Sequence, residues 1–255
     1  MAVAETGEYQ GSLSGGCIEA AVVTEALETL KTGQPRMQSY GAGSPLIDIR
    51  LPCGGAVELL FTPITCVAAI MTALDQRQPF TQPLCLPSGP PLSVSHAPPL
   101  RLSILGHGGT VDALTRLSLS IGVDVAIFTP DSHMADHRGH RATLLKSTKE
   151  DVSIPSDPWT AICFLFHDHD WETALIMQAL DGPALIIGAM GSHKTHAKRL
   201  NQLRSLGVSE EKLDRIKSPI GLIPSSRDPE TLALSILSEA VEAYNATAPT
   251  VLSVS

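Results

Sequence analysis

Four short, almost continuous apolar runs in the second half of the chain constrain its fold more than any other feature. They are LRLSIL at 100–105, VDVAIF at 123–128, AICFLF at 161–166 and ALIIG at 184–188. Strands that are buried on both faces, as in parallel sheets, have this composition. Segments with helical spacing separate the runs, and a last helix is expected after Ser226 with Pro229 near its first position. Alternating strands and helices predict an α/β fold with a doubly wound, mainly parallel sheet over residues 101–255.

The first part of the chain predicts a smaller α+β domain at residues 1–78. Apolar residues between 18 and 30 have helical spacing, and Gly33 is the expected C-terminal stop of that helix. Two apolar runs follow at 47–51 and 56–61. The Pro-Cys-Gly-Gly sequence between these runs predicts a hairpin loop.

A break in composition separates the two predicted domains. Residues 79–100 contain seven prolines. Proline lacks a backbone N–H and favours extended geometry, so this segment is predicted to be an extended linker.

Charge and composition exclude several classes of protein. The chain has 18 Lys and Arg against 26 Asp and Glu, a formal net charge of −8, so the basic surface of a general nucleic-acid-binding protein is missing. Residues 1–10 lack the basic and apolar parts of a secretory signal, and the apolar stretch 59–74 is too short and too polar to span a bilayer. The five cysteines lack the spacing of a disulfide framework or a structural metal site, which predicts a cytoplasmic protein.

A glycine-rich turn follows the first strand of the second domain. Gly106-His107-Gly108-Gly109 lies between a strand and a helix, a context in which backbone N–H groups bind phosphate. The third glycine of a dinucleotide fingerprint is Val111 here. Thr129-Pro130 replaces the usual ribose-binding acid, and Asp131 is its nearest substitute. An NAD site and a glycine-rich turn without a ligand both remain open.

Four consecutive polar residues, His167-Asp168-His169-Asp170, follow the third strand. This is the edge of an open α/β sheet at which ligands bind. The residue types allow a metal site or proton transfer, with His167, nearest the strand, as the best candidate. Because adjacent side chains point in different directions, the alternative is that an aspartate caps the next helix and the histidines lie on the surface.

A second glycine-rich turn, Gly188–Ser192, ends the fourth strand. It leads into the most cationic segment of the chain, from His193 to Arg199. Two glycines, a helix N-terminus and Lys194 favour anion binding at this turn. The alternative is a solvated helix face, to which the residues beyond the first helical turn are assigned.

Two cysteines lie beside pairs of glycines. Cys17 follows Gly15-Gly16 at the expected start of a helix, where the helix dipole lowers the pKa of a thiol, and Cys53 precedes Gly54-Gly55. Each cysteine alone also fits an inert thiol, but the occurrence of two cysteines that each lie beside a Gly-Gly pair favours a functional role. No function is assigned to the remaining cysteines, which are Cys66, Cys85 and Cys163.

Together these motifs resemble the XdhC/CoxI family of maturation factors for molybdenum hydroxylases. The segments that carry the resemblance are SGGCIE at 14–19, PCGGAVELL at 52–60, GAMGSHKTHAKRL at 188–200 and SPIGLIPSSRDPETLALSILSEAV at 218–241. The resemblance implies a small N-terminal domain joined to a Rossmann-like domain. Since family members carry a further strand before SGGC, this chain is expected to be short at its N-terminus.

The resemblance also implies a ligand, its binding residues and the partners. The family binds the molybdenum cofactor, a pterin with a dithiolene and a phosphate, often as a dinucleotide; it assists cofactor sulfuration and passes the cofactor to the apoenzyme. The matching positions are Cys17, Cys53, Gly54, Gly55, Gly106, Gly108, His167, Gly188, Gly191 and Ser192, with Pro219 and Gly221 in the PIGL block. Cys53 is the expected soft contact to the molybdenum. The implied partners are an apo hydroxylase of the xanthine dehydrogenase or CO dehydrogenase type, a cysteine desulfurase-type sulfur donor, and a second copy of the chain in a homodimer.

Hypotheses from different classes follow for the function. The first is a molybdenum-cofactor chaperone without turnover of its own, in which glycine-rich helix starts hold phosphate and the thiols of Cys17 and Cys53 serve as soft donors. The second is an NAD(P)-dependent oxidoreductase, which the strand–helix pattern alone supports and the missing ribose acid disfavours. The third is a structural adaptor that binds no ligand.

Overall fold

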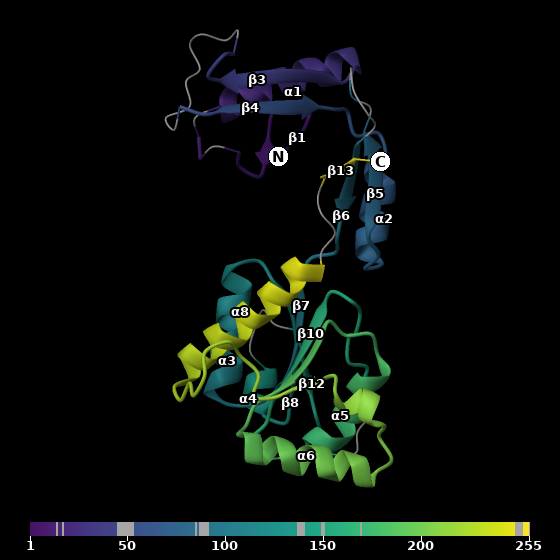
Figure 1. Cartoon of the computed structure of the whole chain (residues 1–255), viewed down its shortest axis with the longest axis vertical. Coiled ribbons are helices and arrows are strands. Elements are labelled where there is room, and N and C mark those ends of the chain that lie inside the picture. The colour runs from purple at the N-terminus through teal and green to yellow at the C-terminus, as the bar shows by residue number, and fades with distance from the viewer. Residues whose placement is uncertain are drawn as a thin grey trace. The chain divides into compact units, whose positions relative to one another are not determined.

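The protein consists of two compact units, each described here by itself. The computed structural model describes residues 1–13, 15–16, 18–44, 54–84, 86, 92–136, 141–148, 151–168, 170–247 and 252–254. Unit 1 comprises Met1–His96 with Pro249–Ser255, and unit 2 comprises Ala97–Ala248. Figure 1 labels the helices and strands of both units.

Unit 2 is built on a six-stranded parallel sheet in the order β12-β11-β10-β7-β8-β9. Its strands are β7 (Arg101–Gly106), β8 (Asp124–Thr129), β9 (Arg141–Leu144), β10 (Thr160–Leu165), β11 (Ile186–Ala189) and β12 (Ile216–Lys217). The four apolar runs correspond to β7, β8, β10 and β11, so the parallel sheet is confirmed. The short edge strands β9 and β12 contain few apolar residues, and the apolar pattern did not indicate them. Between β7 and β10 the strand order reverses, which is the point where open α/β sheets bind ligands.

Helices cover both faces of this sheet (Figure 1). One hydrophobic core packs α3 (Gly109–Ser120) and α8 (Pro229–Thr247) against the strands, and a second packs α5 (Glu172–Asp181) and α6 (His193–Ser205) on the other face. Ile104 of β7 belongs to the first core and Leu105 to the second, which explains why the runs are continuously apolar. The predicted start of the last helix at Pro229 is confirmed. No helix in the described part of the chain is long and apolar enough to cross a membrane.

The first part of unit 1 packs a helix against two strands. Its elements are β1 (Ala2–Val3), β2 (Tyr9–Gln10), α1 (Glu19–Thr32), β3 (Arg36–Gly41) and β4 (Ala56–Phe61). The predicted helix is confirmed and stops at Gly33, whose φ of 66° is left-handed. The strand at 56–61 is also confirmed, but it pairs antiparallel with β3, whereas the apolar pattern predicts pairing with 47–51. Residues 45–53 lie outside the described residues. Periodicity missed β3 because RMQSYG contains few apolar side chains.

The proline-rich segment contributes two strands to a small sheet of unit 1. Beyond α2 (Val67–Asp75), β5 (Phe80–Leu84) pairs with β6 (Leu92–His96), and β6 pairs with β13 (Leu252–Val254). The segment is therefore extended, as its prolines indicate, but it also forms backbone ladders. Pro83 lies in β5, at the edge of this three-stranded sheet, where a missing N–H is tolerated.

Candidate functional site at the carboxyl edge of the parallel sheet

The first glycine-rich turn has one glycine for packing and one beside open space. At Gly106, with φ of 151°, a Cβ would lie 2.6 Å from the carbonyl oxygen of Leu165 in the neighbouring strand β10. Gly108 is the N-cap of α3 and has φ of 89°. No described atom lies within 4 Å of the Cβ position of Gly108. The backbone at Gly108 is therefore accessible to a ligand, whereas Gly106 permits close contact between β7 and β10.

Two histidines meet where the strand order reverses. The ring centroids of His107, after β7, and His167, after β10, are 6.2 Å apart, with an angle of 70° between the ring planes. His107 also lies 6.3 Å from the ring of Phe166. Its Nδ1 is buried and has no hydrogen-bond partner among the described residues. His167 is the histidine that its position after the third strand predicts, whereas the sequence pattern does not predict His107 as its neighbour. The available signal is that both histidines lie within two residues of the carboxyl ends of strands of a parallel sheet.

The residues after His167 do not form a metal site within the described structure. Asp168 Oδ1 accepts a hydrogen bond of 3.0 Å from the backbone N–H of Asp170, so this carboxylate orders the turn before α5. His169 lies outside the described residues. Among the residues that the structure does describe, no three His, Cys, Asp or Glu side chains gather closely enough to hold a metal ion.

The second glycine-rich turn joins β11 to α6. Ser192 caps α6, and its hydroxyl accepts a hydrogen bond from the N–H of Thr195 at 3.2 Å. Gly191 has φ of 129°, and a Cβ there would lie 2.9 Å from Thr195 Cγ2. Gly188 is buried, and its Cβ position is occupied by the side chain of Ile220. The geometry at Gly188 therefore reflects packing against the PIGL block, while Gly191 and Ser192 are exposed at the turn.

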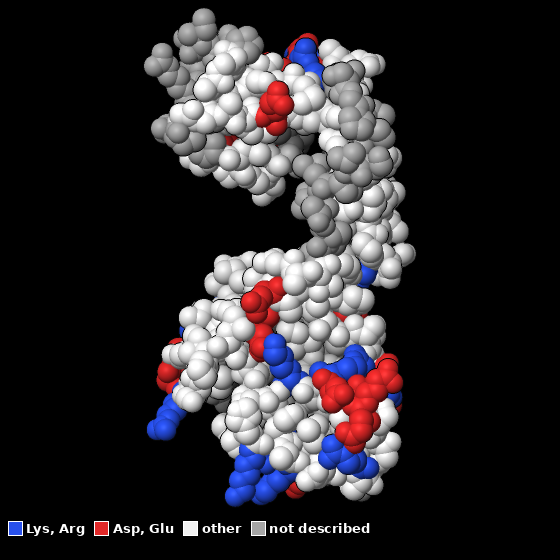
Figure 2. All heavy atoms as spheres, in the orientation of Figure 1, with Lys and Arg blue, Asp and Glu red and all other residues white. Residues whose placement is uncertain are grey.

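A buried arginine fixes this turn. Arg199 Nη2 donates to the carbonyl oxygen of Met190 at 2.9 Å, and Arg199 Nε donates to Glu172 Oε2 at 3.0 Å. Arg199 was expected on a solvated helix face, but it is 7% exposed. Its long side chain reaches back under the turn, where carboxylate and carbonyl oxygens satisfy the guanidinium. The cations that remain exposed on α6 include Lys194 and Lys198, and Figure 2 shows blue side chains along this helix.

The PIGL block connects the end of the sheet to α8. It begins with a cis peptide bond between Ser218 and Pro219. The N–H of Gly221 donates to Glu239 Oε2 at 2.5 Å, and the Nζ of Lys217 lies 2.5 Å from Glu239 Oε1. The block therefore holds Ile220 over Gly188 and connects β12 to α8.

Cys163 of β10 is an inert core thiol. Its side chain is fully buried. Burial, with a smaller contribution from the Glu239 carboxylate, raises the pKa of the Cys163 thiol to about 12. The thiolate, which is the nucleophile and metal ligand, is therefore not formed at neutral pH.

In unit 1, described residues next to and within the SGGC motif donate backbone hydrogen bonds to one buried carboxylate. Glu19 is 4% exposed. Its Oε1 accepts from the N–H of Leu13 at 3.1 Å, and its Oε2 accepts from the N–H groups of Gly16 at 2.9 Å and Ile18 at 3.2 Å. Charge-assisted hydrogen bonds of this kind hold a loop in one conformation. Glu19 is the last residue of the SGGCIE segment, and residue type and spacing alone indicate no role for it.

The two motif cysteines, Cys17 and Cys53, lie outside the described residues, as does Cys85. Next to Cys53, Gly54 has φ of 70° and an open Cβ position, and both Gly54 and Gly55 are exposed at the start of β4. The carbonyl oxygen of Gly55 accepts a hydrogen bond from the N–H of Ala42 at 3.0 Å. The described geometry thus leaves the backbone beside Cys53 accessible.

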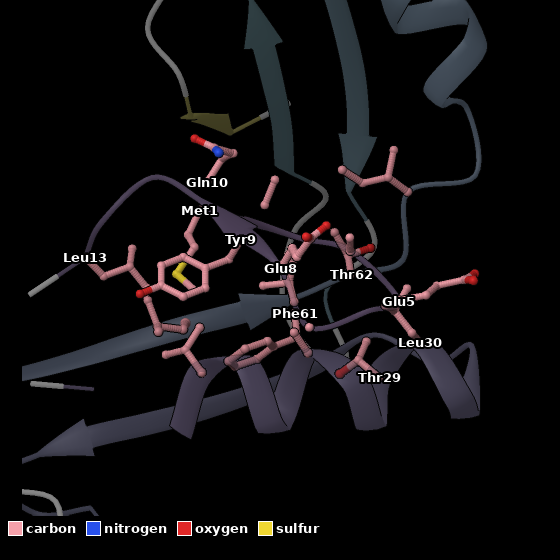
Figure 3. Close-up of a pocket in the computed structure, with 18 of the residues that line it drawn as sticks. Met1, Glu5, Glu8, Tyr9, Gln10, Leu13, Thr29, Leu30, Phe61 and Thr62 are labelled. Atoms are coloured by element: carbon pink, nitrogen blue, oxygen red, sulfur yellow. The ribbon is translucent and has the colours of Figure 1, made fainter. Parts of the chain in front are cut away.

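Unit 1 also contains a large hollow of about 1150 Å³. Figure 3 shows Met1, which precedes β1, and Tyr9 of β2 on one side, and Thr29 and Leu30 of α1 on another. Its lining is mainly apolar. None of the described residues predicted to bind cofactor lines it.

The strand order, the reversal point and the two glycine-rich turns define unit 2 as a Rossmann-like α/β domain. A protein-family sequence model described as the XdhC Rossmann domain matches residues 102–240. A second family model, described as the XdhC and CoxI family, matches residues 1–41. The chain is 35% identical over 257 aligned residues to the molybdenum cofactor insertion chaperone PaoD of Escherichia coli K12, covering 94% of this chain and 76% of PaoD. This chain belongs to the XdhC and CoxI family.

Two further comparisons show more distant similarity. The uncharacterized protein YqeB of Escherichia coli K12 is 24% identical, and the match covers 96% of this chain but 40% of YqeB. A solved structure described as a xanthine dehydrogenase from Bacillus halodurans superposes with a TM-score of 0.73 at 17% identity, covering 97% of this chain and 86% of that one. At this identity, the superposition establishes the shared fold.

Proposed function

We propose that this protein is a maturation chaperone that binds the molybdenum cofactor and supports its insertion into an apo molybdenum hydroxylase. The observation that carries the proposal is the 35% identity, over 94% of the chain, to a protein named as a molybdenum cofactor insertion chaperone. The match includes both units, so it is not limited to a nucleotide-binding fold that many unrelated proteins share.

The carboxyl edge of the unit 2 sheet has the groups that such a ligand needs. Gly108 leaves open space at the start of α3, where backbone N–H groups favour phosphate. His107 has a buried Nδ1 without a described partner, which suits a hydrogen bond to an oxygen or nitrogen of a bound molecule. The residues present therefore fit a phosphate-bearing pterin.

Each residue has a defined part in this proposal. Gly108, Gly191 and Ser192 bind phosphate, and His107 and His167 orient the ligand beside them. Gly106 and Gly188 act through packing, because they allow the strand contacts that shape the edge. The cofactor, when bound, supplies the molybdenum centre that the client enzyme uses; this chain holds, shields and releases it.

Finer features of the proposal follow from the family resemblance. Cys17 and Cys53 are the thiols that would contact the metal or an incoming sulfur, since soft metals prefer thiolate ligands. We propose a cytoplasmic homodimer that accepts sulfur from a cysteine desulfurase-type donor. Its client would be a xanthine dehydrogenase-type or CO dehydrogenase-type enzyme, and its cofactor would be the dinucleotide form.

Co-expression with an apo molybdenum hydroxylase tests this function. Wild-type chain should raise both the molybdenum content and the activity of the hydroxylase, and Cys53→Ser should reduce both. Cys85→Ser, which replaces a cysteine outside the glycine motifs, is the matched control and should behave as wild type. Equal effects of the two variants would remove Cys53 from the proposal, and an unchanged client with wild-type chain would refute the function.

The alternative oxidoreductase is tested on the same preparation. A carrier should not consume NADH or NADPH when offered aldehydes, ketones or purines. Steady NADH or NADPH turnover at about 1 s⁻¹ or faster, the low end for ordinary enzymes, would refute the chaperone function and support a dehydrogenase.

A further inference from the structure

A small cavity lies beside the first glycine-rich turn of unit 2. Its volume is about 240 Å³, and its walls include Gly108 and Gly109 of the turn, Ile127 of β8, and Asp131, His133 and Met134 at the short helix α4 (Ser132–Ala135). It therefore connects the open backbone at Gly108 to the carboxyl end of the neighbouring strand. This volume is below the usual range for a drug-sized ligand, so the cavity suits one part of a larger molecule.

The acid that the sequence lacks directly after β8 is present two residues later. Thr129, fully buried at the end of β8, accepts a hydrogen bond on Oγ1 from the N–H of Asp131 at 3.1 Å. Asp131 Oδ1 in turn accepts from the N–H groups of His133 at 2.9 Å and Met134 at 3.4 Å. This small network fixes the Asp131 carboxylate in the cavity wall. Its second oxygen, Oδ2, receives no hydrogen bond from any residue that the structure describes.

The remaining walls match a nucleoside. Ile127 and Met134 supply apolar surface for a sugar or base, and the free oxygen of Asp131 can accept from ribose hydroxyls, as acids at this place do in dinucleotide-binding sheets. Phosphate linked to that ribose can pass the open Cα of Gly108.

The charge of the cavity distinguishes between two kinds of ribose. Asp112 also lines the cavity, and Arg116 Nε donates to its carboxylate at 3.0 Å. Asp131 has no such cationic partner among the described residues, and the described lining contains neither Lys nor Arg. A phosphate on the ribose 2′-oxygen would therefore face an uncompensated carboxylate at short range.

We infer that this cavity binds the ribose of a nucleoside diphosphate through Asp131 and excludes nucleotides that carry a 2′-phosphate. The inference rests on the proposed function only for the natural ligand, which would be the nucleotide half of a dinucleotide cofactor. Binding of a nucleoside diphosphate by itself does not depend on molybdenum or on a client enzyme.

Calorimetric titration of the full chain with ADP-ribose and 2′-phospho-ADP-ribose tests it, because these probes differ in the 2′-phosphate alone. ADP-ribose should bind at least about tenfold more tightly, the equivalent of one charge-assisted contact. CDP, titrated in parallel, reports whether the cavity accepts a pyrimidine. Equal affinities for the two ADP-ribose probes, or no binding of ADP-ribose and CDP, would overturn the inference.

Asp131→Asn isolates the carboxylate. Asparagine keeps the oxygen that caps α4 but presents N–H₂ in place of the free oxygen, so ADP-ribose should bind about tenfold more weakly and the preference against the 2′-phosphate should shrink.

The matched control is Asp136→Asn at the end of the same helix, which removes the same charge outside the cavity and should leave both affinities unchanged. Equal losses in the two variants would show a general charge effect and would overturn the role of Asp131. Should Asp131→Asn fail to fold, the wild-type comparison of the two probes still decides. Since no probe contains molybdenum or pterin, a chain that binds ADP-ribose but leaves a client inactive refutes only the proposed function.

Discussion

Arg199 of α6 and Glu172 of α5 form an ion pair inside unit 2, with Arg199 Nη2 3.0 Å from Glu172 Oε2. The side chains are 6% and 2% exposed. The same guanidinium binds the carbonyl oxygen of Met190 and donates from Nη1 to the hydroxyl of Ser218 at 3.2 Å. The pair therefore joins two helices to the second glycine-rich turn and to the PIGL block.

Replacing Arg199 should destabilise the protein strongly. Arg199→Met breaks the buried ion pair with Glu172, and removing one member of such a pair costs about 3–5 kcal/mol of unfolding free energy. Urea denaturation followed by circular dichroism measures the loss. Arg204→Met is the control, because Arg204 and its partner Glu210 are both largely exposed, and its midpoint should equal that of wild type. Similar midpoints for both variants would contradict a structural role for Arg199.

Gly188 should prove to be a packing residue. Gly188→Ala forces a methyl group onto Ile220, and overpacking of this kind costs about 1–3 kcal/mol. In an Ile220→Ala background the space is free, so the same substitution should cost much less. A double-mutant cycle of unfolding free energies measures the coupling. A cost that is independent of the residue at 220 would show that the contact with Ile220 does not explain this glycine.

Gly191 should matter for anion binding as well as stability. Gly191→Val places a branched side chain at positive φ on the exposed turn, against Thr195. Affinity for inorganic pyrophosphate, measured by calorimetry, should fall several-fold, with a loss of stability of about 1–3 kcal/mol. Gly207→Val is the matched control, since Gly207 also has positive φ, 86°, but lies beyond the other end of α6. Unchanged pyrophosphate affinity in a folded Gly191→Val protein would argue against this turn as a phosphate site.

Glu19 should hold the SGGC loop in place. Glu19→Ala removes the acceptor of three backbone N–H groups, so the amides of Leu13, Gly16 and Ile18 should exchange hydrogen faster. Nuclear magnetic resonance follows these amides individually. Glu28→Ala, on the exposed face of the same helix and 3.6 Å from Lys31, should leave them unchanged. Equal exchange rates in wild type and Glu19→Ala would disprove the role of the carboxylate.

Cys163 should make the protein less stable at alkaline pH. The thiol pKa is raised from 9.0 to about 12 in the folded protein, so between these values the unfolded chain has lost a proton that the folded protein retains. Stability therefore falls as pH rises through this window. Comparing urea denaturation at several pH values for wild type and Cys163→Ala isolates the effect, because other groups titrate in both proteins. Parallel curves would show that this thiol does not contribute.

Local pattern was sufficient for most of the secondary structure. Continuous apolar runs gave the positions of β7, β8, β10 and β11, and Gly33 gave the end of α1. Local pattern failed where the signal was weak, as in β3, where Tyr40 alone among the six residues is buried and pairing with β4 defines the strand. Motif spacing also indicated the family, which the comparisons confirmed.

By itself, the amino-acid sequence determined the α/β class, the two glycine-rich turns and the family, because these depend on periodicity and on short motifs. Tertiary structure alone decided that His107 lies beside His167, that Arg199 is buried, and that Gly188 makes room for Ile220. It also decided that Asp131, which lies two residues after the end of β8, forms part of the cavity wall beside Gly108. Contacts between distant segments follow from strand order and from which polar groups find partners on burial, and neither is encoded in the spacing of neighbouring residues.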